Sequence, residues 1–401
     1  MMKNMKNRIR RTLRTSLLAT VMLVTSSGLT TIEAAGATTI TKLPPPVWTN
    51  ATVAGNGGEI VEGPLEVPSK NLIYLHTREN YATQTKIWLV DKVKALDSNT
   101  GKVKWSAQFT DPGTSMFREA SYYLVSPDGT VYVTFNSNND GTHIYAVGSD
   151  GKRKWKTVLS TQEGRLALLQ NGSLLFIGSG KMDKNGNYVG GSLTLIDRNG
   201  RKVKNKAYTG TVEAEHNRVI IQTNTNARST GPRIEVFDMS LNKVFSYQVP
   251  ADAYAETGYN TVLNDGTVIL RMNLNKTGNR LIGFSPSGKL LWGRNVEGNA
   301  EIAPLGNNYG VFANNKLSVY SINGLLKSAI VNDSTEAFTS LWQIPDGSVG
   351  LDFPGSGFYV LDQRTLAPLF TFKLPNDVFF TYSGKNTGYT ITETGVSKYK
   401  L

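Results

Sequence analysis

Asn136, Asn138 and Asp140 occupy alternate positions and precede Gly141. Oxygen-bearing side chains in this order are typical of the first half of a calcium-binding loop. The twelfth position of such a loop normally holds a closing acidic residue, whereas here it is Val147. Asn136, Asn138 and Asp140 are therefore candidate metal ligands, and a polar hairpin loop is the competing interpretation.

The sequence gives little support for catalysis. It contains no cysteine, which excludes disulfides, thiolate zinc sites and cysteine nucleophiles. The three histidines, His76, His143 and His216, have no ligand spacing such as HExxH, so we expect surface imidazoles. No GxSxG elbow, phosphate loop or dinucleotide fingerprint is present. We expect a protein that is not an enzyme and has no cofactor, with calcium left open.

One unit of strand, polar turn and strand recurs along the chain, as in ALDSNTGKVKW (95–105) and AVGSDGKRKW (146–155). Seven such turns lie 36 to 50 residues apart, which leaves room for four short strands in each interval. Glycine-bearing hairpin turns such as SPDG (126–129) stand upstream, and the residues after them alternate with period two. This repeat predicts an all-β fold of four-stranded antiparallel blades, a β-propeller.

The two ends of the repeat array predict how it closes. Residues 386–401 supply two strands of a last repeat but no fourth strand, and VWTNATVAG, which begins at Val47, resembles the fourth strand LWGRNVEG (291–298). An N-terminal strand that joins the last blade would pair both free edges. We therefore predict eight blades, with seven as the alternative.

The first repeat resembles the pyrroloquinoline-quinone-like propellers, a family that includes quinoprotein alcohol dehydrogenases and an outer-membrane assembly lipoprotein. The residues that carry this resemblance are Ala95, Leu96, Asp97, Thr100, Gly101, Lys102 and Trp105. The resemblance implies a propeller scaffold. The dehydrogenases typically use adjacent cysteines over the quinone, and the lipoprotein carries a lipidated cysteine, so this cysteine-free chain departs from both.

Four tryptophans share the fourth-strand position of their repeats: Trp48, Trp105, Trp155 and Trp292. A repeated aromatic residue at one register fills the same layer in every repeat. We therefore predict that these side chains pack between blades and do not form a ligand site.

The loops between the second and third strands are long in the first five repeats and short in the last two, at 313–315 and 354–356. Such loops emerge on one side of a propeller, which we call the long-loop face, and loops on a rigid scaffold commonly carry recognition. Aromatic and arginine residues are typical binding anchors. The candidates here are Arg78, Tyr81, Trp88, Lys181, Tyr188, Arg228 and Arg271.

A second pattern consists of glutamates just before or at the start of the first strand of a repeat. They include Glu62, Glu119, Glu163, Glu256, Glu301 and Glu336. Since the first strand lines the central channel of a propeller, we predict an acidic set at the channel mouth, and Glu119, Glu163 and Glu256 join the ligand-binding candidates. The competing interpretation is solvated surface pairing with Lys and Arg.

The N-terminus has the order of a secretory signal peptide. Six Lys and Arg residues precede a short apolar run, 17–24, and small residues follow up to Ala37. We assign 1–35 to the signal peptide, 36–46 to an extended lead-in and 47–401 to a single propeller domain. Removing 1–35 lowers the formal charge from +12 to about +7, and the remaining basic residues are dispersed, which argues against nucleic-acid binding.

These observations favour a secreted, non-catalytic binding propeller that is extracellular or associated with the cell surface and has no permanent membrane anchor. Its expected partner is a cell-wall polymer or another exported protein. One alternative is a lyase or hydrolase that acts on glycans with carboxylates at the channel mouth. Another is a structural component of a surface or coat.

Overall fold

The computed structural model describes residues 38–55, 57–82, 87–109, 120–137, 141–160, 164–182, 188–223, 232–250, 253–255, 260–274, 278–296, 300–331, 340–353, 357–374 and 379–401. Apart from one 3-10 turn, η2 (Pro68–Lys70), the regular structure of these residues is strand. In this part of the chain no helix is long and apolar enough to span a membrane.

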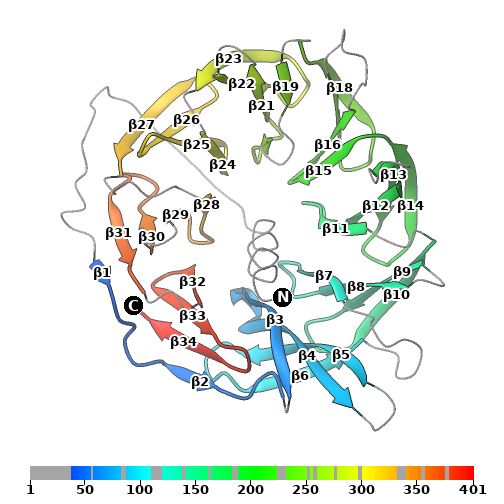
Figure 1. Cartoon of the computed structure of the whole chain (residues 1–401), viewed down its shortest axis with the longest axis vertical. Helices are drawn as coiled ribbons and strands as arrows, with labels where there is room; N and C mark the ends of the chain where they lie inside the picture. The colour runs from blue at the N-terminus through cyan, green and yellow to red at the C-terminus, as the bar shows by residue number, and fades with distance from the viewer. Residues whose placement is uncertain are drawn as a thin grey trace. The chain divides into compact units, whose positions relative to one another are not determined.

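The chain divides into two compact units, and the five-blade unit is Thr52–Ala300 (Figure 1). Blade 1 contains β3 (Gly58–Val67), β4 (Leu72–Ala82), β5 (Ile87–Asp97) and β6 (Val103–Gln108). Blade 2 contains β7 (Ala120–Val125), β8 (Val131–Ser137), β9 (Gly141–Val147) and β10 (Arg153–Leu159). Blade 3 contains β11 (Gly164–Leu168), β12 (Leu174–Met182), β13 (Tyr188–Ile196) and β14 (Lys202–Tyr208).

The remaining two blades of this unit have the same strand order. Blade 4 contains β15 (Thr211–Glu215), β16 (Arg218–Thr223), β17 (Arg233–Phe237) and β18 (Lys243–Gln248). Blade 5 contains β19 (Ala253–Ala255), β20 (Thr261–Val262), β21 (Val268–Leu274), β22 (Gly278–Phe284) and β23 (Leu290–Val296). Both β19 and β20 pair with β21, so the first strand of blade 5 is formed in two pieces.

The three-blade unit joins Glu301–Leu401 with the segment that ends at Ala51. Blade 6 contains β24 (Glu301–Leu305), β25 (Asn308–Ala313), β26 (Lys316–Ser321) and β27 (Gly324–Ile330). Blade 7 contains β28 (Ser340–Gln343), β29 (Val349–Phe353), β30 (Gly357–Leu361) and β31 (Pro368–Phe372), with β1 (Thr38–Ile40) added in parallel to β31. Blade 8 contains β32 (Phe379–Gly384), β33 (Thr387–Ile391), β34 (Val396–Lys400) and β2 (Trp48–Asn50).

The predicted closure is confirmed. β2 pairs antiparallel with β34, with Trp48 opposite Lys398 and Asn50 opposite Val396, so it supplies the fourth strand of blade 8 (Figure 1). The ring of Trp48 lies 6.3 Å from that of the buried Tyr389. The chain is an eight-bladed β-propeller, and the seven-blade alternative is wrong because residues 379–400 form a sheet of their own.

Several segments predicted as long loops are largely strand. β4 and β5 stay paired as far as Ala82 opposite Ile87, and β12 and β13 as far as Met182 opposite Tyr188. Cross-strand contacts continue beyond the blade body and stabilise these hairpins. In blade 6, by contrast, the turn is only Asn314 and Asn315, whose φ angles of 49° and 57° suit a tight hairpin turn.

The hydrophobic core lies between successive blades. One cluster joins Tyr74 and Val93 of blade 1 to Tyr123 and Val133 of blade 2, and similar clusters join each further pair of successive blades within the two units. Each blade carries apolar side chains on both faces of its sheet, and these faces can be buried only against the adjacent blades. Each fully buried large apolar side chain contributes about 1.5–3 kcal/mol, so stability depends on blade stacking.

We expect Trp48→Ala to lower the free energy of unfolding by about 2 kcal/mol. Truncating a fully buried aromatic residue costs roughly 3–5 kcal/mol, and Trp48 is only half-buried. Urea unfolding followed by intrinsic fluorescence measures the change. Val47→Ala is the matched control, because Val47 is 58% exposed. Equal stability of the two variants would contradict a stabilising role for the closing strand.

Candidate functional site

Three of the predicted binding residues lie on the hairpin of β4 and β5. Arg78 is opposite Asp91, and Tyr81 is opposite Trp88, whose backbone alone is described. Tyr81 is 40% exposed, and its hydroxyl donates a hydrogen bond of 2.5 Å to Oε2 of Glu79. This hairpin thus presents one described aromatic side chain toward solvent.

The other predicted residues are scattered over the remaining blades. Arg271 is in β21 and is only 5% exposed, so most of its side chain is inside the fold. Lys181 and Tyr188 are on the facing ends of β12 and β13, and Asn136 is opposite Thr142 in blade 2. For Lys181, Tyr188 and Asn136 only the backbone is described.

Several predicted residues lie outside the described residues, and their roles stay predictions. They are Arg228, Glu119, Glu163, Glu256, Asn138 and Asp140. Among the residues that are described, no group of three or more His, Asp or Glu side chains could hold a metal ion. The calcium candidate therefore stays untested.

A buried ionic cluster lies at the base of the same hairpin. Asp91 is fully buried, and its Oδ1 lies 2.8 Å from Nε2 of His76 and 3.2 Å from Nε of Arg78. These residues share one sheet face because Tyr74, His76 and Arg78 alternate along β4 and Asp91 is directly opposite Arg78. A buried carboxylate is tolerated only when it is paired in this way.

Glu62 extends this cluster from β3, where it is opposite His76. Burial raises the pKa of Glu62 to about 7. The ring of Tyr123 in blade 2 lies 5.9 Å from the His76 ring. Burial, together with the charge of Glu62 and the nearby Tyr74, raises the pKa of Tyr123 far above its ordinary value. Glu62 therefore changes protonation near neutral pH.

The opposite face of the hairpin carries a second set of charges. The carboxylate of Glu79 lies 2.5 Å from Nζ of Lys92 and 3.3 Å from Nζ of Lys94. Burial acts to raise the pKa of Glu79, but hydrogen bonds from Lys92, Tyr81 and Lys94 outweigh it and lower that pKa. Lys94 also donates a hydrogen bond of 2.7 Å to the carbonyl of Val53, which ties the segment before β3 to the hairpin.

The two clusters hold the hairpin but do not form a catalytic arrangement in the described residues. The His76 and Asp91 pair resembles the orienting half of a catalytic triad, yet no hydroxyl nucleophile is hydrogen-bonded to His76. Charged groups on both faces instead fix the base of the β4 and β5 hairpin, from which Tyr81 projects. The arrangement offers a rigid platform and a carboxyl group, that of Glu62, whose pKa is raised to about 7.

The expectation of surface histidines is wrong. His76, His143 and His216 are 2%, 7% and 9% exposed. The burial of His76 could have been predicted from the alternation along β4, since Tyr74, His76 and Arg78 share one sheet face. Its partner Asp91 is 15 residues away, and their contact depends on strand register. Burial lowers the pKa of His216 to about 4, so its imidazole is neutral.

A further pair of carboxylates, both half-buried, was not predicted from the sequence. Glu213 and Glu215 lie two residues apart on β15, where Glu213 accepts a hydrogen bond from Asn260 at 2.9 Å and Glu215 accepts one from the Val262 amide at 2.8 Å. Burial, with a smaller effect of the Glu213 charge, raises the pKa of Glu215 to about 8. Both acceptors link blade 4 to blade 5, which gives them a structural role.

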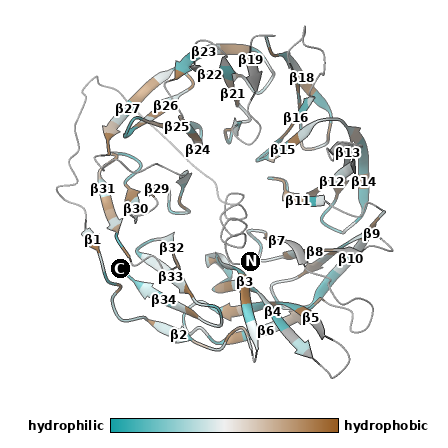
Figure 2. Cartoon of the chain, viewed as in Figure 1, coloured by the Kyte–Doolittle hydropathy of each residue, from teal (hydrophilic) through white to brown (hydrophobic). Residues whose placement is uncertain are grey.

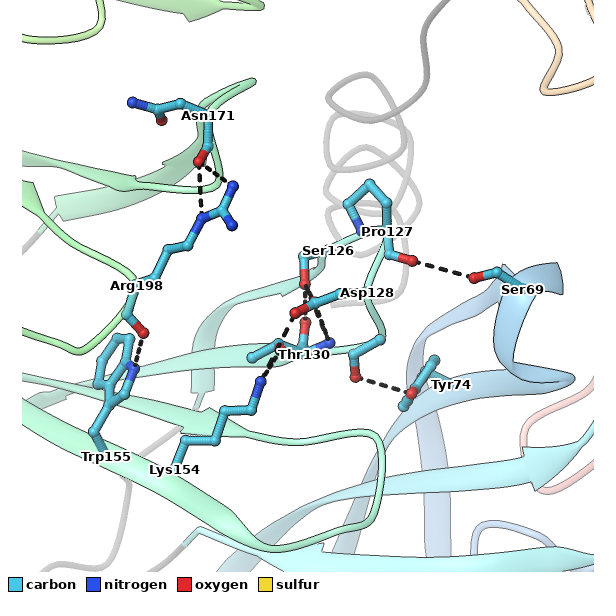
Figure 3. Close-up of polar contacts among 11 residues, drawn as sticks. Ser69, Tyr74, Ser126, Pro127, Asp128, Thr130, Lys154, Trp155, Asn171 and Arg198 are labelled. Atoms are coloured by element: carbon cyan, nitrogen blue, oxygen red, sulfur yellow. Dashed lines mark hydrogen bonds and ion pairs between the residues drawn. The ribbon is translucent and has the colours of Figure 1, made fainter.

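The predicted packing of the fourth-strand tryptophans between blades is confirmed for Trp105 and Trp155. The Trp105 indole donates to the Ser149 carbonyl at 2.8 Å, and the Trp155 indole donates to the Arg198 carbonyl at 2.9 Å. Figure 3 shows Trp155 beneath Arg198, whose guanidinium in turn contacts the Asn171 carbonyl. Each indole N–H thus donates to the turn of the next blade and is not available to bind a ligand.

A polar turn completes this junction in blade 2. Asp128 accepts hydrogen bonds from Ser126 and from the Thr130 amide, and Lys154 donates a hydrogen bond of 2.6 Å to the Thr130 hydroxyl (Figure 3). Tyr74 of blade 1 donates to the Gly129 carbonyl at 2.9 Å. The first turn of blade 2 is thereby fixed to blade 1 and to its own fourth strand.

We expect Glu62→Gln to change the pH dependence of stability. The pKa of Glu62 is raised from 4.5 to about 7 in the folded state, so the folded state binds the proton more tightly than the unfolded state does. The contribution of this site is fully present below pH 4.5 and is lost as the pH rises through about 7. The variant should therefore gain stability relative to the wild type across this window.

Urea unfolding at several pH values measures that difference. Glu59→Gln is the control, because Glu59 is on the same strand and its side chain is 41% exposed. A constant difference between Glu62→Gln and the wild type across the window would contradict the raised pKa of Glu62.

Comparison with known proteins supports the resemblance of the repeat to a known family. Residues 46–243 match the family model described as outer membrane protein assembly factor BamB. No curated protein matches the sequence. Among solved structures, BamB from Moraxella catarrhalis is 16% identical, with a TM-score of 0.36, and the match covers 82% of this chain and 80% of that chain.

Two further solved structures have similarly distant relationships. Virginiamycin B lyase from Staphylococcus aureus is 14% identical with a TM-score of 0.42, and the match covers 70% of this chain and 94% of that chain. Sqt1 from Saccharomyces cerevisiae is 11% identical with a TM-score of 0.46, with coverage of 90% and 100%. At this distance they carry no information on function. The family match over residues 46–243 supports the resemblance of the repeat to the pyrroloquinoline-quinone-like β-propeller repeat family.

Proposed function

We propose that the protein is a secreted, non-catalytic binding propeller whose long-loop face docks a cell-surface polymer or another exported protein. The observation that carries this proposal is the unequal length of the hairpins between second and third strands. In blade 1 these two strands have 11 residues each and stay paired to their ends. In blade 6 they have six residues each and are joined by two asparagines.

The charges beneath the β4 and β5 hairpin support the proposal. A projecting hairpin binds well when it is rigid before binding, because less conformational entropy is then lost. The contacts of Asp91 with His76 and Arg78 on one face, and of Glu79 with Lys92 on the other, supply that rigidity. The description of the matched family, an assembly factor, also supports binding rather than turnover.

The enzyme alternative needs two carboxylates that a substrate can reach, one of them with a raised pKa. Glu213 and Glu215 meet the second condition, since the pKa of Glu215 is about 8. Their oxygens, however, accept hydrogen bonds from Asn260 and Val262 of the next blade, which favours a structural role. The binding proposal is therefore the better supported of the two.

Incubating the mature protein with glycan and exported-protein libraries tests the proposal. Retention without turnover supports a binding propeller, whereas turnover would overturn the proposal in favour of an enzyme. If the protein neither retains nor converts any library member, the proposal is overturned in favour of a structural surface or coat component.

We expect Tyr81→Ala to weaken retention of the bound partner about tenfold, because exposed tyrosines on rigid elements are frequent binding hot spots. Biolayer interferometry with the retained partner measures the effect. Tyr81→Phe keeps the ring and removes the hydrogen bond to Glu79. It therefore separates the contact of the ring with the partner from the effect of the hydrogen bond on the hairpin. Leu325→Ala, at a 55% exposed residue of β27, is the control. Unchanged affinity for Tyr81→Ala would remove this residue from the docking face.

The acidic set has its own test. If Glu119, Glu163 and Glu256 attract a cationic ligand, the triple change to glutamine should weaken its binding at low salt and have less effect at high salt. Titration calorimetry at two salt concentrations measures this. Unchanged binding of every retained ligand would show that these carboxylates have no recognition role.

A further inference from the structure

The fourth strands of blades 1, 2 and 3 bring together basic residues that are far apart in the sequence. β6, β10 and β14 occupy equivalent edge positions in successive blades. The bond from Trp105 to Ser149 joins blade 1 to blade 2, and the bond from Trp155 to Arg198 joins blade 2 to blade 3. These three strands and the turns before them therefore form one neighbouring surface, which we call the basic edge.

Several exposed basic side chains of the basic edge have partners within the fold. Six others have no carboxylate or carbonyl partner among the described residues: Lys102, Lys152, Arg153, Lys156, Arg201 and Lys202. In Figure 2 the hydrophilic colour covers much of β14. Intervals of about 50 residues separate equivalent positions, as from Lys102 to Lys152, so this concentration is invisible in the linear sequence.

The acidic residues of the same turns form no ion pair with these six side chains in the described part of the chain. Asp97 accepts hydrogen bonds from the amides of Asn99 and Thr100, and Asp197 accepts them from the amides of Asn199 and Arg201. These carboxylates thus serve to close their own turns. Salt bridges reach Lys104 from Asp97 and Lys154 from Asp128, and neither involves the six side chains named above.

Protection of sheet edges does not account for the basic edge. Exposed edge strands commonly carry lysine, because a charge there prevents pairing with other chains. That need applies to every blade, yet β23 of blade 5 exposes Leu290 and Leu291. The single lysine of β27, Lys327, donates to the carbonyls of Gln363 and Arg364 within its own unit. Among the described fourth strands and the turns before them, most exposed basic side chains belong to blades 1 to 3, and blade 5 has Lys289 at the position equivalent to Lys102.

A small cavity adjoins the basic edge between blades 3 and 4. Its volume is about 210 Å³, and its wall is formed by Lys206, Ala207, Tyr208, Thr209, Ile221, Thr223 and Glu235. Ligand pockets for drug-sized molecules measure roughly 300–1,000 Å³, so this one suits a single small unit. The Tyr208 hydroxyl donates to the Gly178 carbonyl, and the Thr223 hydroxyl donates to the Arg233 carbonyl. Both oxygens can still accept a hydrogen bond from a polyol hydroxyl, whereas Glu235 is paired with Lys243.

We propose that the basic edge and this cavity bind an extended, phosphodiester-linked polyol polymer. Its phosphates lie against the six basic side chains that have no carboxylate partner in the described part of the chain, and one hydroxylated unit occupies the cavity. Lysine ammonium groups act on phosphate as point charges and need no fixed bidentate geometry. The rings of Trp105 and Trp155 on this edge are half-buried, and their indoles donate to the next blade. Rings held in this way are poor stacking platforms, which disfavours nucleic acid.

This inference goes beyond the proposed function, because the basic edge and the long-loop face are different surfaces. The test uses the full mature chain and poly(glycerol phosphate) of defined length, titrated by calorimetry at low and physiological salt. The variant Lys152→Gln/Arg153→Gln/Lys202→Gln should bind at least tenfold more weakly at low salt. The slope of log affinity against log salt should fall by about two, since each neutralised phosphate contributes roughly 0.7 in a single-stranded polyanion.

The control variant Lys289→Gln/Lys373→Gln/Lys385→Gln removes the same number of exposed charges from blades 5, 7 and 8. It should bind within twofold of the wild type. A second variant, Ala207→Trp, fills the cavity from an exposed position of its wall and changes no charge. It should weaken binding of poly(glycerol phosphate) about tenfold and leave binding of inorganic polyphosphate unchanged, with urea unfolding as the check on folding.

Three results would overturn the inference. They are equal losses in the two triple variants, tighter binding of single-stranded DNA than of poly(glycerol phosphate), and no effect of Ala207→Trp on the polyol polymer. Tyr81→Ala separates this inference from the proposed function. It should leave polymer binding unchanged while it weakens retention on the long-loop face, so failure at one surface is not failure at the other.

Discussion

Burial of apolar side chains between successive blades is the constraint on which the structure depends. Tyr74, Phe176 and Phe353 are fully buried, and each belongs to a cluster that spans two blades. A blade on its own would leave such residues in water, so the repeat is stable only as a stack. The constraint also governs charge. Asp91 can remain buried because register places His76 and Arg78 within 3.2 Å of it.

The contact between one blade and the turn of the next keeps its geometry while its chemistry varies. Trp105 and Trp155 fill the fourth-strand position with an indole N–H, whereas Lys204 fills it with an ammonium that donates to the Ser240 carbonyl at 3.0 Å. In blade 6 the same position is Lys327, opposite Val319. In blade 4 the position is Phe245, opposite Val236, and the Phe245 ring contacts Gly288 of the next turn without a hydrogen bond. Sequence similarity between repeats therefore fades while the fold persists.

Sequence could predict the features that depend on the repeat period but not those that depend on strand register. Turn spacing and alternation were sufficient for eight blades and for closure by Trp48 to Asn50, because both depend on repeated local patterns. The contact of His76 with Asp91 depends on which residues of β4 and β5 face each other, and β1 pairs in parallel with β31 more than 300 residues away. No local pattern encodes such contacts. For the same reason the long hairpins were predicted as loops and the histidines as surface residues.

Stacking also determines where function can evolve. First, second and third strands are committed to neighbouring blades, so a new charge there needs a buried partner, as Glu79 has in Lys92. The fourth strand and the distal hairpins are free of that requirement. Lys202 and Val203 are both exposed on β14, and either side chain is compatible with the fold. Changes at equivalent positions of successive repeats accumulate on one surface, as Lys102, Lys152 and Arg201 do. A repeat protein can thus acquire a charged binding surface through single substitutions in several repeats, without any change in its core.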